Sequence, residues 1–100
     1  MESNVKLKPR REFTDDVNLY SLGVDELSGR FFVSLPVTIG VVDYEEYYGL
    51  ADAEYARFLS DPVGAAAFVE ECREHQHDER LLQKPGWNRG TPIRGLTPLE

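Results

Sequence analysis

The sequence RFFVSLPVTIGVV, residues 30–42, decides the fold of this chain because it carries the strongest β-strand pattern. Apolar residues occupy every second position, which places them on one face of an extended strand. They are Phe31, Val33, Leu35, Val37, Ile39 and Val41. Pro36 cannot donate a hydrogen bond to a sheet. We therefore expect either an edge strand with position 36 pointing outward or a break into two strands.

The segment upstream of this strand is expected to supply its antiparallel partner. Residues 17–22, VNLYSL, have the apolar content of a short strand. Between the two, Asp25 is expected to cap a turn that Gly29 closes in a left-handed conformation. Residues 1–16 are polar and hold four basic residues around Pro9. They are expected to form a mobile, extended arm or an edge segment.

Two consecutive helices are expected downstream. The first begins near Ala51, where Glu54 supplies half of a capping box. Its apolar face is expected to gather Tyr47, Leu50, Tyr55, Phe58 and Leu59. Asp61 is suited to cap the second helix, because Pro62 is favoured at a first helical position. That helix is expected to run to about His77 and to bury Val63, Ala66, Ala67, Val69 and Cys72.

The C-terminal segment has a different composition. Residues 84–98 are interrupted by Pro and Gly, which predicts an irregular tail over residues 84–100. Trp87 is expected to pin this tail to the body, and Arg89 to stack on Trp87 or pair with the acidic helices. All 100 residues fit one domain, 1–100. The fold class expected is α+β, with a small antiparallel sheet of two to four strands packed against two consecutive helices.

Negative charge is concentrated in the middle of the chain. The net charge is −7, and residues 43–80 alone contribute −8, from eleven Asp/Glu and three Lys/Arg. This balance argues against nonspecific binding to nucleic acid, which needs cationic contacts to phosphates. It favours attraction to a basic protein partner, with simple solubility as the alternative explanation.

The sequence lacks the signals of membrane and secreted proteins. No apolar run is long enough to span a bilayer, and the first residues do not resemble a secretory signal. The single Cys72 cannot form an internal disulfide, which fits a reducing compartment. We therefore expect a cytoplasmic protein that does not bind membranes.

The residues with metal-ligand chemistry cluster at the end of the second expected helix. Cys72 and His75 would share a helix face there, with Glu79 about two turns beyond Cys72. Structural zinc needs four ligands in paired short spacings, and the chain holds no second Cys/His pair. No metal or other cofactor is therefore expected, and Cys72, His75 and Glu79 remain a weak alternative. No phosphate-binding Gly loop or nucleophile elbow occurs either.

The most distinctive surface candidate is the stretch DYEEYY, which alternates carboxylates with tyrosines where the strand is expected to give way to the helix. Its residues are Asp43, Tyr44, Glu45, Glu46, Tyr47 and Tyr48. Tyrosine is enriched at protein interfaces, and carboxylates attract basic partners. The alternative is that two or three of these tyrosines belong to the core.

These observations predict a non-enzymatic, acidic protein-binding module, such as an immunity-protein or antitoxin-like inhibitor of a basic partner. One alternative is an accessory subunit or homodimer that pairs through the Pro36 edge or the alanine-rich helix. Another is a small metal-dependent enzyme or sensor that uses Cys72 and His75.

Overall fold

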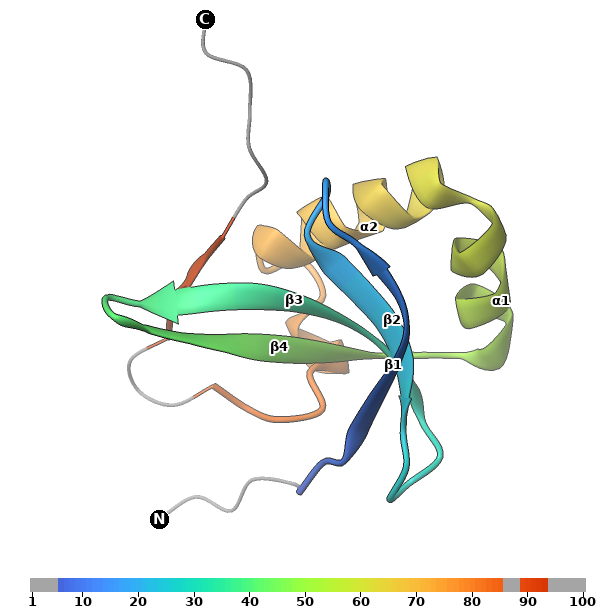
Figure 1. Cartoon of the computed structure of the whole chain (residues 1–100), viewed down its shortest axis with the longest axis horizontal. Helices are drawn as coiled ribbons and strands as arrows, with labels where there is room; N and C mark the ends of the chain where they lie inside the picture. Colours follow the sequence, from blue (N-terminus) through green and yellow to red (C-terminus); the bar gives the residue numbers. More distant parts are fainter. Residues whose placement is uncertain (1–5, 86–88, 94–100) are drawn as a thin grey trace, which may run out of the picture.

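A computed structural model describes residues 6–85 and 89–93 and confirms the α+β class. Four antiparallel strands in the order β1-β2-β3-β4 form the sheet, and a short β5 also pairs with β3. Two helices pack on one face (Figure 1). The elements are β1 Pro9–Asp15, β2 Tyr20–Asp25, β3 Phe31–Ile39, β4 Val42–Leu50, α1 Asp52–Ser60, α2 Pro62–Arg73, the 3-10 helix η1 Asp78–Arg80 and β5 Thr91–Pro92.

Strand β3 is the centre of the sheet, so the expectation of an edge strand or a break at Pro36 was wrong. It runs unbroken, with β4 along one side and β2 followed by β5 along the other. The backbone N and C=O of one residue in an antiparallel strand point to the same side. The Pro36 carbonyl accepts a hydrogen bond from Ile93 N at 3.0 Å. Its nitrogen therefore also points away from β4, into the interval between β2 and β5, and β4 loses no partner.

The second half of the N-terminal segment is an ordered edge strand and not a mobile arm. β1 pairs with β2 along its length, with an irregularity between Arg11 and Phe13. The first strand was expected at residues 17–22, but β2 starts at Tyr20. The reason is that Asp15 accepts hydrogen bonds from Val17 N and Asn18 N, both at 2.9 Å, and so builds a turn before β2.

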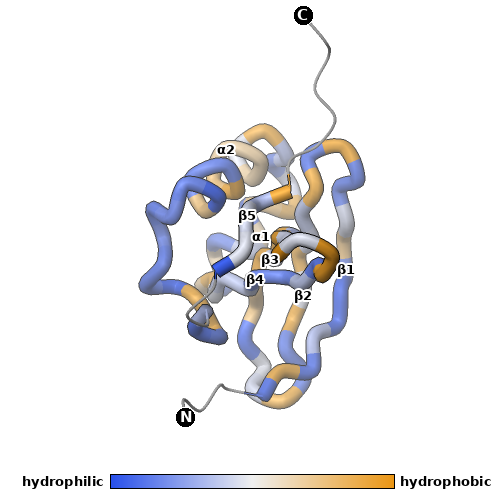
Figure 2. The backbone as a smooth tube through the Cα atoms, turned by 90° about the vertical axis from the view of Figure 1, so that its left-hand side faces the viewer, coloured by the Kyte–Doolittle hydropathy of each residue, from blue (hydrophilic) through white to orange (hydrophobic). Residues whose placement is uncertain are grey.

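A hairpin replaces the expected passage from strand to helix at residue 43. Gly40 has φ +63°, as the first central residue of a type II′ turn requires, and β4 then returns along β3. The tip carries the exposed side chains of Val41 and Val42. It projects at the left of Figure 1 and carries apolar colour in Figure 2.

The capping and turn signals in the sequence are confirmed. Asp61 accepts a hydrogen bond from Gly64 N at 3.0 Å at the start of α2. Glu54 accepts one from Ala51 N at 2.8 Å at the start of α1. Gly29 has φ +79° in the turn after β2, which the buried Asp25 organises through hydrogen bonds from neighbouring backbone amides.

The helices turn slightly different faces to the sheet than expected. α2 buries Ala65, Val69 and Cys72, whereas Val63 is 81% exposed and Ala67 is also exposed. α1 buries Tyr55 and Phe58 but leaves Leu59 exposed. The apolar stripe recurs at three- and four-residue intervals, and in α2 it begins at position 65 rather than 63. α2 ends at Arg73, four residues early, because His75 adopts φ +64°.

The main core lies between the helices and one face of the sheet. It unites residues from β2, β3, β4, α1 and α2: Tyr20, Leu22, Val33, Leu35, Val37, Tyr48, Leu50, Tyr55, Phe58, Ala65, Val69 and Cys72. The other face of the sheet has no helix over it in the described part of the chain (Figure 1). Residues 86–88 and 94–100, including the predicted anchor Trp87, lie outside the described residues.

Candidate functional site

Strand β4 separates the six predicted partner-binding residues into two sets, because successive side chains of a strand point to opposite faces. Asp43, Glu45 and Tyr47 lie on the face away from the helices, here called the curled face. Tyr44, Glu46 and Tyr48 lie on the face that packs against the helices and the C-terminal segment. In the second set Glu46 and Tyr48 are buried, whereas Tyr44 is half-buried.

The inward set is structural. Tyr48 is fully buried, and its hydroxyl lies 2.8 Å from Glu46 Oε1 and 3.2 Å from the Cys72 carbonyl. Burial, followed by the hydrogen bond to Glu46, raises the pKa of Tyr48 far above its ordinary value. The Tyr44 hydroxyl accepts a hydrogen bond from Gly90 N at 2.9 Å. These tyrosines belong to the core and its border, as the alternative interpretation of the sequence had it.

Glu46 belongs to a buried ion pair. Arg89 donates to both of its carboxylate oxygens, at 2.8 and 3.1 Å, and also to Asp78 at 2.8 and 3.1 Å. The side chain of Glu46 is only 5% exposed. Hydrogen bonds from Arg89 hold the pKa of Asp78 below its ordinary value. The predicted pairing of Arg89 with an acidic helical segment is confirmed at Asp78 of η1, whereas its other partner, Glu46, lies on strand β4.

An ion pair joins the two outer strands across the curled face. Arg11 of β1 lies 3.3 Å from Glu45 of β4, across the two strands between them. Strands in a sheet lie nearly 5 Å apart, and Figure 1 shows β1 and β2 running steeply across β3 and β4, so the sheet is strongly twisted and curled. This face holds an open pocket of about 370 Å³, here called the sheet pocket.

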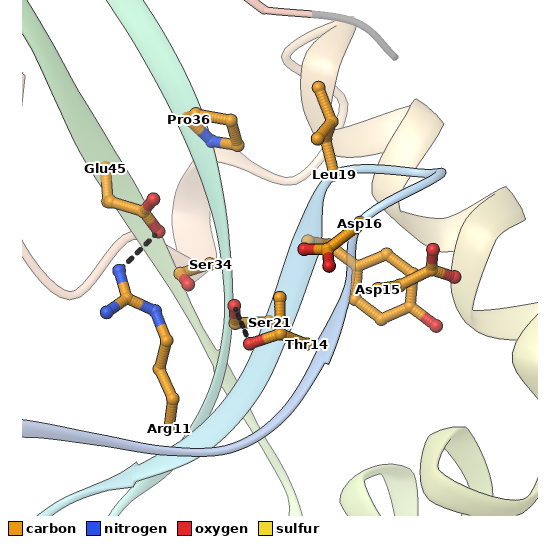
Figure 3. Close-up of a pocket in the computed structure, with 10 residues that line it drawn as sticks. Arg11, Thr14, Asp15, Asp16, Leu19, Ser21, Ser34, Pro36 and Glu45 are labelled. Carbon is orange, nitrogen blue, oxygen red and sulfur yellow. Dashed lines mark hydrogen bonds and ion pairs between the residues drawn. The ribbon is translucent and has the colours of Figure 1, made fainter. Parts of the chain in front are cut away.

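Figure 3 shows the arrangement of side chains in the sheet pocket. Arg11 and Glu45 meet at one side, and Asp15 and Asp16 stand at the other. The full lining consists of Arg11, Thr14, Asp15, Asp16, Leu19, Tyr20, Ser21, Ser34, Pro36 and Glu45. The lining combines carboxylates, hydroxyls and one cation.

Three residues that line the sheet pocket carry a buried polar atom without a hydrogen-bond partner: Tyr20 Oη, Ser34 Oγ and Glu45 Oε1. The Oγ of Ser34, a residue with 0% exposure, has no hydrogen-bond partner. The Oε1 atom of Glu45 is buried and accepts no well-aligned hydrogen bond, although the Arg11 guanidinium lies 3.3 Å away. The neighbouring hydroxyls of Thr14 and Ser21 satisfy each other at 3.0 Å. Buried polar groups usually find a partner, so these three atoms point to a ligand or a water.

The carboxylates of the sheet pocket are engaged to different degrees. Asp15 receives hydrogen bonds from Val17 and Asn18, which hold its pKa below the ordinary value, with Asn18 the larger cause. Asp16 stands exposed at the rim. Three carboxylates against one guanidinium give the lining a formal charge of −2. The sheet pocket can therefore attract a cation.

The structure separates the residues of the weak metal alternative. Cys72 is buried in the core, and burial raises the pKa of its thiol to about 12. His75 and Glu79 are exposed beyond the end of α2. Within residues 6–85 and 89–93, no group of three or more His, Cys, Asp and Glu side chains could hold a metal ion.

A second pocket, of about 490 Å³, lies near the junction of β4, α1 and η1. Its central charges, Glu54 and Arg80, are joined by two hydrogen bonds at 2.8 and 2.9 Å. Arg80 also donates to the Gly49 carbonyl at 3.2 Å. Since these groups satisfy one another, this pocket offers less to a ligand than the sheet pocket.

Sequence reasoning found one part of the sheet pocket and missed the rest. Glu45 was among the predicted residues, whereas Arg11 was assigned to an extended arm or edge segment and Ser34 was not singled out. The available signal was the small or polar residue at alternate positions of β3, opposite the apolar series. The curl that brings Arg11 to Glu45 depends on contacts 34 positions apart and has no local signature.

Comparisons of the chain with known protein families, with curated proteins and with solved structures find no match. In the part of the chain that the structure describes, neither helix combines the length and apolar character needed to cross a bilayer.

Proposed function

We propose that this chain is a non-enzymatic protein-binding module whose acidic curled face docks onto a basic partner. An inhibitor of the immunity-protein or antitoxin type is the specific form proposed, acting in the cytoplasm, where a lone reduced Cys72 is stable. The observation that carries the proposal is the acidic, helix-free face of the sheet, with an unsatisfied polar pocket at its centre.

The pairing of the protein's own cations supports an acidic docking surface. Five arginines form ion pairs with carboxylates of the same chain: Arg10, Arg11, Arg73, Arg80 and Arg89. These pairs leave the surplus of acidic groups at the surface, where Asp16 and Asp43 are exposed. Surface charge of one sign attracts a partner of the opposite sign and accelerates association.

Tyr47 supplies an aromatic group to the same face. It is half-buried and meets the buried Phe32 ring edge-on, with ring centroids 5.0 Å apart. Tyrosines held in one orientation add contact area at little entropic cost, which is why they are common in interfaces. Tyr47 and Asp43 would border a partner whose basic groups face the sheet pocket.

The test is capture of proteins from cells of the source on immobilised wild type, Asp43→Lys, Asp16→Lys and Glu79→Lys. Each substitution changes the charge equally, and Glu79, on η1, serves as the control because it lies off the curled face. The proposal expects a basic protein to bind to the wild type and to Glu79→Lys, and not to bind to Asp43→Lys or Asp16→Lys. Raising the salt concentration from about 50 to about 500 mM shortens the screening length severalfold. The captured basic protein should therefore elute over this range.

Identical proteins on all four surfaces, or binding indifferent to salt, would contradict the proposal. Sedimentation of the pure protein then tests the alternative of a homodimer or accessory subunit. The Pro36 position proposed for a dimer edge lies inside the sheet, so a dimer would pair through an outer strand, β1 or β4, or through the alanine-rich α2.

A further inference from the structure

We propose that the sheet pocket receives one arginine or lysine side chain from the basic partner, with Glu45, Asp16 and Ser34 accepting its hydrogen bonds. The inference rests on the proposed function and adds the chemical group that is recognised. It is argued from the charge of the pocket, its unsatisfied acceptors and its apolar walls.

The charge of the lining selects a cation. Asp15, Asp16 and Glu45 outnumber the single Arg11, which leaves −2 before any ligand enters. Asp15 is committed to the turn that it caps, so Asp16 and Glu45 are the carboxylates open to an incoming group. An anion would meet net repulsion here, and a neutral group would leave the carboxylates without a counter-charge.

Ser34 gives an observation independent of charge. Its buried hydroxyl lines the sheet pocket without a hydrogen-bond partner, and Figure 3 shows it between the ion pair and the hydroxyls of Thr14 and Ser21. A serine oxygen can accept as well as donate. A guanidinium offers five N–H donors and an ammonium three, enough to reach Ser34 and a carboxylate together.

The walls suit the aliphatic part of a long basic side chain. Leu19, Tyr20 and Pro36 contribute apolar surface beside the carboxylates. A volume of about 370 Å³ lies at the lower end of the range for small-ligand pockets and fits one side chain. Arginine and lysine bury their methylene stems against such surface while the head stays polar.

The wall at Leu19 is held in place from behind. Leu19 adopts φ +57°, a conformation uncommon for a residue other than glycine. The Arg73 guanidinium donates to the carbonyls of Asn18 and Leu19, at 2.6 and 3.1 Å. The guanidinium of Arg73 thus ties the turn to α2. A fixed wall lowers the entropy lost when a side chain is bound.

Arg11 occupies part of the position that a partner cation would take. Its contact with Glu45 is an ion pair at 3.3 Å without the geometry of a hydrogen bond, and its side chain is 46% exposed. A partially exposed pair of this kind is weak and can exchange. An incoming arginine with better geometry would therefore displace Arg11 from Glu45.

The test is a nuclear magnetic resonance titration of the ¹⁵N-labelled protein with Nα-acetyl-arginine amide at low salt. Nα-acetyl-citrulline amide, which has the same shape without the charge, is the matched control. Saturable shifts are expected at Ser34 and Glu45, and binding of the citrulline probe should be about tenfold weaker. Glu45→Gln should weaken the arginine probe about tenfold, and Arg11→Ala should tighten it about threefold. Asp52→Asn, at an exposed position of α1 away from the sheet pocket, should leave the affinity for the arginine probe unchanged.

Equal binding of both probes, equal affinity in Glu45→Gln, or no saturable shift would overturn the inference. Spermidine binding more tightly than the arginine probe would overturn the choice of a protein side chain over a free amine. The two proposals fail differently. If a basic protein binds through Asp43 but Glu45→Gln leaves its affinity unchanged, only the pocket assignment fails. If the arginine probe binds as expected but no basic protein docks, the protein-binding function fails.

Discussion

Removal of the Arg89 side chain should destabilise the protein strongly, because it would leave Glu46 charged, buried and without its counter-ion. Glu46 has a side-chain exposure of 5% and receives two hydrogen bonds from Arg89. Breaking a buried pair by deleting one member costs about 3–5 kcal/mol. The Tyr48 hydroxyl still donates to Glu46, and Asp78 is 44% exposed and returns to water. We therefore expect a loss of about 3 kcal/mol for Arg89→Ala.

Urea unfolding followed by far-ultraviolet circular dichroism measures this loss. In a chain of 100 residues, about 3 kcal/mol corresponds to a fall in Tm of about 12–24 °C. Arg10→Ala is the matched control, because its ion pairs with Glu12 and Glu26 lie at the surface, where solvent screens them, and the expected loss is small. The double variant Glu46→Gln/Arg89→Ala should recover part of the stability by removing the buried charge. A loss for Arg89→Ala no larger than for Arg10→Ala would refute the reasoning.

Three further predictions follow from the packing and protonation of single residues. Gly23→Ala should destabilise by about 2 kcal/mol, because an added Cβ would lie 2.8 Å from the Phe32 ring and would overlap the Arg10 carbonyl; urea unfolding measures it. Cys72 should resist alkylation at pH 8 in the native state, because it is buried and its pKa is raised to about 12; mass spectrometry should detect labelling only on unfolding. Hydrogen bonds hold the pKa of Asp25 below its ordinary value of 3.8, and the bond from the Ser28 hydroxyl has the largest effect. Its stabilisation should therefore be complete above pH 3.8 and be lost as the pH falls through the folded-state pKa, so the deficit of Asp25→Asn should shrink in acid.

Each of these has a control and a contradicting result. Val41→Ala, at a fully exposed position, should leave stability nearly unchanged, and a Gly23→Ala protein equally stable would disprove the close approach of β1. Rapid labelling of native Cys72 would show that the core around α2 opens freely. A deficit of Asp25→Asn that is constant from pH 7 to about pH 2 would mean that the carboxylate is not stabilised in its charged form.

Local chemistry made much of the fold predictable. Alternating apolar residues identified β3, and Asp61 with Pro62 identified the start of α2, because both signals depend on neighbours in sequence. β4 was missed because its charged residues hide its pattern. Glu46 occupies an inward position only because Arg89, 43 residues away, neutralises it. β1 was predicted only as one of two alternatives, an edge segment or an arm, because exposed edge strands carry charges that resemble a solvated terminus.

The candidate site was predictable only in part, for the same reason. The sequence singled out residues 43–48 as one surface, but they lie on β4, so only Asp43, Glu45 and Tyr47 share the curled face. It could not identify Arg11 or Ser34 as their neighbours. These residues meet through the curl of four strands and the turn at Asp15, neither of which follows from local preference.

The most direct test of the docking proposal is a map of the binding surface by nuclear magnetic resonance, with the captured basic partner added to ¹⁵N-labelled protein. The account predicts that amide shifts gather on the curled face, at Ser34, Asp43, Glu45 and Tyr47, and fade as salt is raised. Shifts that gather instead on the outer surfaces of α1 and α2, with the curled face unchanged, would contradict it.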